Sequence, residues 1–152
     1  MKKLLSAYIF CFIVITTGIC SASVPDEQVA LGGISYQSSS SYVKSIYGEP
    51  DRVTSTNNDP LYKTVEKYYY GNSFLVEFSN SKAVWISISA HNGLATPAGV
   101  EVGMKMSTLH DVYGPPTKVA RDRNGKVTMY YYGSYKSEYI GLRFDIKNET
   151  IT

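Results

Sequence analysis

The sequence has only two cysteines among its 152 residues, and both lie close to its start, at Cys11 and Cys20. Beyond residue 20 the chain therefore offers no disulfide, no thiolate metal ligand and no thiol nucleophile. Packing of side chains has to stabilise the rest of the protein.

Histidine is equally scarce, and acidic residues are not arranged for catalysis. His91 and His110 are the two histidines, and neither has a spacing that brings a second metal ligand to the same face, so both are interpreted as structural or solvated. No Gly-x-Ser-x-Gly nucleophile motif occurs. Glu77 is the one acid expected at the centre of a sheet face, and its expected counterpart is Arg143, so a catalytic carboxylate pair is missing. The sequence predicts no catalytic residue, no metal and no cofactor.

Runs of one charge are absent as well. The chain has 15 basic and 13 acidic residues, a net charge of +2. Without Lys2 and Lys3 the basic count falls to 13 and the two signs balance. A neutral chain with no basic run is a poor nucleic-acid binder and a poor ligand for anionic lipid. The composition therefore disfavours nucleic acid and anionic lipid as partners.

The first 22 residues have the pattern of a secretory signal peptide. A basic start is followed by an apolar run from Leu4 to Ile19 and then by small residues, which predicts cleavage after Ala22 or Ser23. The run is slightly short for a membrane span, and no second one follows. We therefore expect a soluble, exported protein that is secreted or held in the periplasm or cell envelope, without stable membrane insertion after cleavage.

Two alternatives concern this N-terminal segment. The first is a retained N-terminal anchor. The second is acylation of Cys20, which would make the protein a lipoprotein. Ile19 argues against acylation, because a lipidation motif requires a small residue directly before the cysteine, and isoleucine is bulky and β-branched.

One segment occurs twice, as Ser41–Pro50 and as Ser107–Pro116. The copies are 66 positions apart at the Tyr-Gly pair, and the same offset returns at Phe78 and Phe144. Each copy predicts a short helix with one apolar face, ended by its glycine. Ser40 or Ser41 is expected to cap the first helix, and Ser107 the second.

Three strands are expected after each helix. Tyrosine-rich and aliphatic runs separated by turn residues predict strands at 64–70, 74–78 and 84–89, then at 127–132, 139–144 and 149–152. The predicted fold class is α+β, a tandem repeat in which each unit is a short helix followed by a three-stranded antiparallel meander. The helices pack on one face of the sheet. The expected divisions are a flexible leader at 23–30, repeat 1 at 31–95, and repeat 2 at 96–152 with a truncated third strand, in one monomeric domain.

Strand alternation assigns the side chains to two faces. The inward set is aliphatic and aromatic: Tyr68, Tyr70, Phe74, Val76, Phe78, Val84, Ile86, Ile88, Tyr130, Tyr132, Ile140, Leu142 and Phe144. The outward set is the predicted partner-binding surface: Tyr69, Leu75, Glu77, Trp85, Tyr131, Tyr139 and Arg143. Tyr and Trp give large contact areas with few rotatable bonds, which favours binding. Alternatively, these aromatics are ordinary strand formers.

The phrase Val102-Gly103-Met104-Lys105-Met106-Ser107-Thr108-Leu109, leading to Tyr113-Gly114-Pro115-Pro116, carries a family resemblance. Together with the Tyr-x-Tyr-Gly strand it resembles the repeat of β-lactamase inhibitor proteins and of the SmpA/OmlA outer-membrane lipoproteins. The resemblance extends from Leu31 to Thr152 and is closer in the second copy, since Gln37-Ser38 stands in the first copy where Gly103-Met104 stands in the second. It implies an exported protein that binds another protein through a sheet surface formed by both repeats.

The sequence thus predicts an exported, non-catalytic protein-binding module with an aromatic sheet surface. Two alternatives are a secreted enzyme inhibitor of the β-lactamase-inhibitor type and a structural or assembly factor of the envelope. The chain departs from both families, because the inhibitors have disulfides and the lipoproteins a clear lipidation cysteine. No contact residue can be transferred from either family by position.

Overall fold

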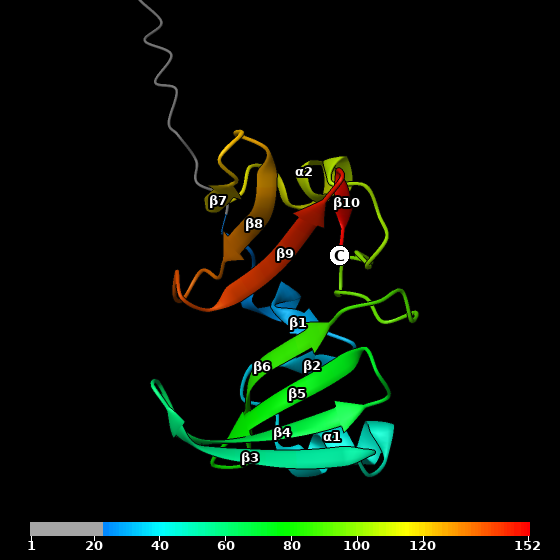
Figure 1. Cartoon of the computed structure of the whole chain (residues 1–152), viewed down its shortest axis with the longest axis vertical. Coiled ribbons are helices and arrows are strands. Elements are labelled where there is room, and N and C mark those ends of the chain that lie inside the picture. The colour runs from blue at the N-terminus through cyan, green and yellow to red at the C-terminus, as the bar shows by residue number, and fades with distance from the viewer. Residues whose placement is uncertain (1–22) are drawn as a thin grey trace, which may run out of the picture.

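The computed structural model describes residues 23–152, and over this range the protein is α+β (Figure 1). Two short α-helices accompany three antiparallel sheets, two with four strands and one with two strands. None of the helices in this range is long and apolar enough to cross a membrane. The predicted signal peptide at 1–22, together with Cys11 and Cys20, lies outside the described residues.

Helix α1 spans Ser40–Tyr47 and is capped by Ser39. Ser39 has an extended backbone, and its hydroxyl accepts a hydrogen bond of 3.1 Å from the Tyr42 amide. The predicted cap, Ser40 or Ser41, is therefore wrong, because both residues already lie inside the helix. Gly48 ends the helix with a φ of +79°, a conformation that glycine adopts without steric cost.

Helix α2 spans Ser107–Tyr113. The predicted cap Ser107 is its first helical residue, and the preceding Met106 provides no side-chain hydrogen bond. Both helices bury only part of their predicted apolar faces. Val43 and Leu109 are fully buried, whereas Ile46 and Val112 are exposed. Tyr47 and Tyr113 are partly buried against the same clusters, so each helix buries a narrow strip of its surface.

The first large sheet has four strands in sequence order: β3 (Arg52–Asp59), β4 (Lys63–Tyr70), β5 (Phe74–Ser79) and β6 (Lys82–Ile88). The prediction of three strands is wrong, because it lacks β3. This strand is polar and almost wholly exposed, so it shows no apolar alternation in the sequence. We refer to α1 and this sheet as the first unit.

The second large sheet also has four strands: β7 (Lys118–Arg121), β8 (Val127–Gly133), β9 (Gly141–Lys147) and β10 (Thr150–Ile151). Here the sequence misses β7, which is short and largely exposed. Strand β9 begins two residues after the predicted start at Tyr139. We refer to α2 and this sheet as the second unit.

Each unit has its own buried cluster, and most of the residues predicted to face inward belong to one of them. Val43 of α1 shares the first cluster with Ile34, Tyr68, Phe74, Val76, Phe78 and Ala83. Leu109 of α2 shares the second with Tyr130, Tyr132, Leu142, Phe144, Ile146 and four further residues. Full burial of one such side chain contributes about 1.5–3 kcal/mol.

A β-bulge changes the register of β6. Glu77 pairs with Trp85 and Phe78 with Ala83, so Val84 has no partner on β5. As a result Ala83 is completely buried, and Val84 is only partly buried. The prediction that Val84 faces the core is wrong, because the extra residue interrupts strict alternation.

The N-terminal leader is packed onto the second unit. The Val24 amide donates to the carbonyl of Gly133 at 2.7 Å, and the Val24 carbonyl accepts from the Tyr135 amide at 3.1 Å. Val24 and Val29 belong to the second buried cluster. A 3₁₀ turn, η1 (Asp26–Gln28), lies between them. The polar composition of 23–30 predicts a mobile segment, whereas in the structure its valines contribute to a core.

From the leader the chain crosses to the first unit. Strand β1 (Ala30–Leu31) pairs with β2 (Ile34–Ser35), and Ile34 is fully buried in the first cluster. The segment from Val24 to Ile34 therefore contributes to both cores. In Figure 1 it runs in blue between the two large sheets.

Candidate functional site

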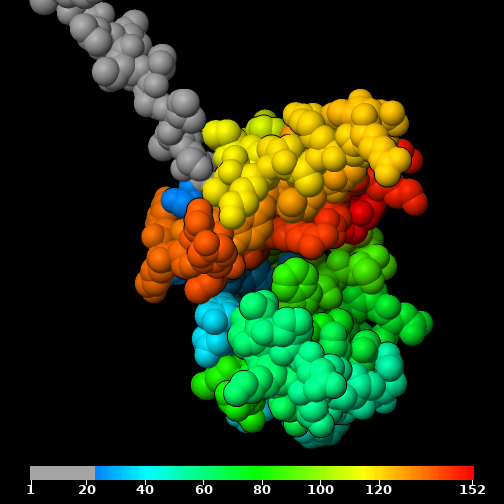
Figure 2. Space-filling view, turned by 60° about the vertical axis from the view of Figure 1, so that its left-hand side comes forward, coloured from blue at the N-terminus to red at the C-terminus, as the bar shows by residue number. Residues whose placement is uncertain are grey.

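A groove with a cavity volume of about 440 Å³ lies between the two large sheets. One wall is β6, from which residues 84–88 line the groove, and the other is formed by residues 139–145, which include most of β9. Because consecutive residues line each wall, backbone as well as side chains borders the space. Figure 2 shows the surface hollowed between the orange and red residues above and the green residues below. The volume is typical of a ligand site.

Both walls are open strand edges. Strand β6 is the outermost strand of its sheet, and its free edge is covered only at the start, where Ala83 exchanges hydrogen bonds of 2.8 Å with Gln37 and Ser38. Strand β10 pairs only with Ile146 and Lys147 of β9. Within residues 23–152, no strand pairs with the remaining length of either edge. Open edges carry unpaired backbone groups that can bind another chain.

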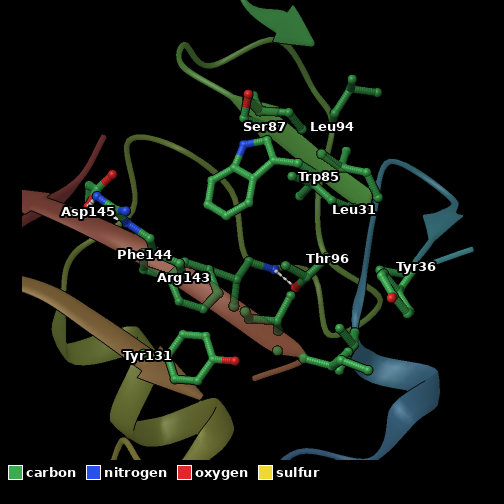
Figure 3. Close-up of a pocket in the computed structure, with 18 of the residues that line it drawn as sticks. Leu31, Tyr36, Trp85, Ser87, Leu94, Thr96, Tyr131, Arg143, Phe144 and Asp145 are labelled. Carbon is green, nitrogen blue, oxygen red and sulfur yellow. Dashed lines mark hydrogen bonds and ion pairs between the residues drawn. The ribbon is translucent and has the colours of Figure 1, made fainter. Parts of the chain in front are cut away.

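Four of the seven predicted surface residues line this groove, namely Trp85, Tyr131, Tyr139 and Arg143. Trp85 is 47% exposed, and in Figure 3 its ring projects from β6 towards β9. Tyr139 is 83% exposed. The Lys118 ammonium lies 5.7 Å from the Tyr131 ring centre and 5.5 Å from that of Tyr139. The structure thus brings together aromatic residues from both sheets.

The Tyr131 hydroxyl is a buried polar group without a hydrogen-bond partner among the described residues. It lies over Gly141, where an added Cβ would be 2.9 Å away. Burial raises the pKa of Tyr131, and the negative charge of Glu138 adds to this effect. The hydroxyl therefore stays protonated and can donate. An unpaired buried polar group costs about 1–3 kcal/mol, which an acceptor on a ligand would offset.

Two open strand edges and a set of aromatic side chains define the groove. No family model, curated protein or solved structure matches the chain. The resemblance to the inhibitor and lipoprotein repeats therefore stays a prediction. What the groove binds has to be argued from its own residues.

The other three predicted residues, Tyr69, Leu75 and Glu77, lie on the outward face of the first sheet and do not line the groove. The Arg52 guanidinium stacks 3.6 Å from the Tyr69 ring centre. Cross-strand pairing places Glu77 directly beside Trp85. The seven residues thus form two adjoining areas, a sheet face and a groove, which meet at Trp85.

Glu77 and Arg143 each have an ion-pair partner within their own sheet. Glu77 accepts a hydrogen bond of 2.7 Å from Lys67 on the neighbouring strand, and Arg143 pairs with Asp145 at 2.9 Å. The hydrogen bond that Lys67 donates to Glu77 raises the pKa of Lys67. Glu77 and Arg143 therefore do not contact each other.

The expected match of Glu77 with Arg143 can be compared with the pairing of strands in the two large sheets. Tyr69 pairs with Leu75 in the first sheet, and Tyr131 pairs with Arg143 in the second. If the two sheets are aligned on Tyr69 and Tyr131, Arg143 corresponds to Leu75 and Asp145 to Glu77. The same pairing aligns Phe144 with Val76 and not with Phe78. An offset taken from single residues misses this shift, because the loop between β8 and β9 is longer.

The two histidines have local partners. His91 Nδ1 lies 3.3 Å from a carboxylate oxygen of Glu101, and His110 Nε2 lies 3.2 Å from the Tyr130 hydroxyl. Within residues 23–152, no group of three or more His, Cys, Asp or Glu side chains is placed to hold a metal ion.

Several groove residues were not identified in the sequence because they lie in the short strand β1 and in loops. Leu31, Tyr36, Leu94 and Val100 line the groove between the two walls. Figure 3 shows Leu31 and Leu94 beside Trp85, and Tyr36 at the side of the groove. The sequence feature that could have indicated these groove residues is the presence of large apolar side chains within glycine-rich or polar segments.

Proposed function

We propose that the protein is an exported, non-catalytic binding module, and that the groove between β6 and β9 holds part of another protein. The observation that carries this proposal is the convergence of Trp85 and Tyr131, from two sheets, and of Tyr139, from the loop before β9, on one groove with open edges. Trp, Tyr and Arg are the residues that most often dominate binding energy at protein interfaces. The half-exposed Trp85 ring can still lose contact with water when a partner binds.

The outward face of the first sheet extends the proposed surface. Leu75 lies between Tyr69 and Ser87 in register, and Glu77 lies between Lys67 and Trp85. This face is therefore a row of mixed polar and apolar groups that leads to the groove. A central apolar anchor with a polar rim is the usual anatomy of a protein interface.

We further propose that the two units are repeats of one motif, each with a helix packed on a four-stranded meander. Equivalent contacts support this. The Tyr70 hydroxyl donates to the Gly48 carbonyl at 3.4 Å, and the Tyr132 hydroxyl donates to the Gly114 carbonyl at 3.3 Å.

The segments before the helices support the same proposal. In the first unit the Ala83 amide donates to the Ser38 carbonyl, and in the second the Ile151 amide donates to the Met104 carbonyl. Each pre-helix segment thus pairs with the last strand of its own unit. Two units of the same arrangement would then meet at one groove.

Site-specific photo-crosslinking tests the binding proposal. Tyr139 is replaced by p-benzoylphenylalanine in the producing cell, and the control is the same replacement at Tyr135. Tyr135 is 68% exposed on the same loop but does not line the groove. We expect a discrete protein adduct from position 139 only. No adduct at 139, or the same adducts at both positions, would contradict the proposal.

The inhibitor and envelope roles predict different adducts. An inhibitor forms its adduct with a soluble enzyme, and adding the purified protein to that enzyme, a β-lactamase for instance, removes activity stoichiometrically. An assembly factor forms its adduct with an envelope component and leaves enzyme activity unchanged.

A further inference from the structure

We propose that the occupant of the groove is an extended segment of the partner protein, which adds to the free edge of β6 as a further strand. This inference rests on the proposed binding function and specifies the chemistry of the partner. The segment is recognised through its backbone, with short side chains fitting on either side.

The hydrogen-bond pattern of β6 identifies the groups that are free to bind. The Ser89 amide donates to the Ser73 carbonyl at 2.9 Å, so this is a hydrogen-bonded pair. Such pairs alternate along an antiparallel ladder. The backbone groups of Trp85 and Ser87 therefore face β5, and those of Ile86 and Ile88 face the groove. Two residues thus present their N–H and C=O groups to an incoming strand.

The protein already uses this edge for backbone pairing. Ala83 accepts from the Gln37 amide and donates to the Ser38 carbonyl, both at 2.8 Å. The pairing stops after Ala83, although the edge continues to Ile88. An added segment would continue along the same edge towards Ile88. Addition of an extended peptide to an exposed sheet edge is a recurring mode of recognition.

The charges of the groove favour an uncharged segment. Glu101 pairs with His91, and Arg143 pairs with Asp145. The carboxylate and guanidinium side chains that line the groove therefore have partners already. A charged occupant would have to compete with these contacts, while an uncharged backbone would not.

The Tyr131 hydroxyl fits the same occupant. It is buried, it lines the groove, and it has no acceptor among the described residues. A peptide carbonyl is a neutral acceptor of the required kind. A segment bound on β6 can therefore receive a hydrogen bond from the opposite wall as well.

The direction of β9 is compatible with a segment that runs antiparallel to β6. In Figure 1 the arrows of β6 and β9 point in the same direction on the two sides of the groove. A segment antiparallel to β6 is therefore antiparallel to β9 too. Apolar residues at alternate positions of the segment would face Leu31 and Leu94, and the intervening ones would face Trp85.

Peptide selection with fluorescence and hydrogen exchange tests this inference. A random heptapeptide phage library is selected on the exported protein, and the enriched peptides are synthesised. Trp85 is the one tryptophan of the chain, so its emission reports directly on the groove. We expect a blue shift on binding and about 30-fold weaker binding by the Trp85→Ala variant, measured by calorimetry.

Amide exchange followed by NMR distinguishes strand addition from side-chain contact alone. Saturation with peptide should slow exchange of the Ile86 and Ile88 amides at least about tenfold, and change Trp85 and Ser87 much less, because those amides already pair with β5. A peptide N-methylated at alternate residues, so that it cannot pair with β6, should bind weakly or not at all.

Failure to enrich any peptide would overturn the inference. A blue shift of Trp85 without slower exchange at Ile86 and Ile88 would also overturn it, and would show that the groove binds a folded surface. In both cases a specific crosslink from position 139 would still support the binding function. If peptides bind but position 139 gives no crosslink, the groove takes free peptides and not the proposed protein partner.

Discussion

Trp85 and Tyr131 come from different sheets and line the same groove, with the indole ring half exposed and the phenol hydroxyl buried. One side chain offers apolar area, and the other offers a hydrogen-bond donor. The pair therefore combines an anchor with a polar contact, which together can fix both the position and the orientation of a bound group.

Replacing Trp85 with alanine should separate binding from folding. Because nearly half of the side chain is exposed, we expect a melting temperature within about 3 °C of the wild type, in keeping with the small effects of surface substitutions. The crosslink from position 139 should be lost. Thermal unfolding followed by circular dichroism measures the first effect. A drop of ten degrees or more would show that Trp85 belongs to a core.

Replacing Gly141 with alanine should destabilise the protein. An added Cβ would overlap the carbonyl oxygen of Tyr132, which is a backbone atom and cannot rotate away. We expect a loss of about 1–3 kcal/mol in the free energy of unfolding, measured with urea. The control is Gly133→Ala, where the nearest atom is 3.2 Å away and the loss should be smaller. Equal losses would contradict this account of the β8–β9 pairing.

Replacing Ser39 with alanine should weaken α1. The substitution removes the acceptor for the Tyr42 amide, and the expected cost is about 1 kcal/mol in the free energy of unfolding. Ser40→Ala is the matched control, since Ser40 is the first helical residue and does not cap. A larger effect at Ser40 than at Ser39 would place the start of the helix one residue later.

Alkaline pH should destabilise the fold through its buried tyrosines. Burial raises the pKa of Tyr132 and of Tyr113 above the ordinary value, which is near 10 in an unfolded chain. Above about pH 10 the unfolded chain loses these protons while the folded chain keeps them. Stability is therefore complete below pH 10 and falls above it, by at most about 1.4 kcal/mol per pH unit for each tyrosine.

The variant Tyr132→Phe isolates one part of this pH dependence. It lacks the hydroxyl that bonds to the Gly114 carbonyl, so it should be less stable than the wild type at pH 8. Its free energy of unfolding, measured with urea from pH 8 to pH 11, should fall less steeply above pH 10. An unchanged slope would show that Tyr132 does not keep its proton preferentially in the folded state.

The sequence predicted the buried face of the central strands correctly because alternation there is strong. Val76, Tyr132 and Phe144 are buried as expected. The edge strands β3 and β7 were missed, because an exposed polar strand shows no such pattern. The bulge at Val84 was missed for a related reason, since one extra residue reverses the alternation on only one side of it.

The candidate site could be predicted only in part. Alternation placed Trp85 and Arg143 on outward faces, but it gave no information on how two sheets lie relative to each other. The groove forms because of how the two sheets lie relative to each other and because the N-terminal segment passes between them. The free edge of β6 depends on a missing neighbour, which a local sequence pattern cannot reveal.

The packing of the N-terminal leader determines the order in which parts of the chain can become buried during synthesis. Val24 and Val29 are among the first of the described residues to be made, yet the core to which they belong is completed by Leu142, Phe144 and Ile151 near the other end of the chain. The first unit can close while the second is still being made, whereas these two valines have to wait. Contacts between such distant parts of a chain form slowly. The earliest of the described residues are thus the last to become buried, and until then a newly made chain would expose an incomplete apolar surface to proteases.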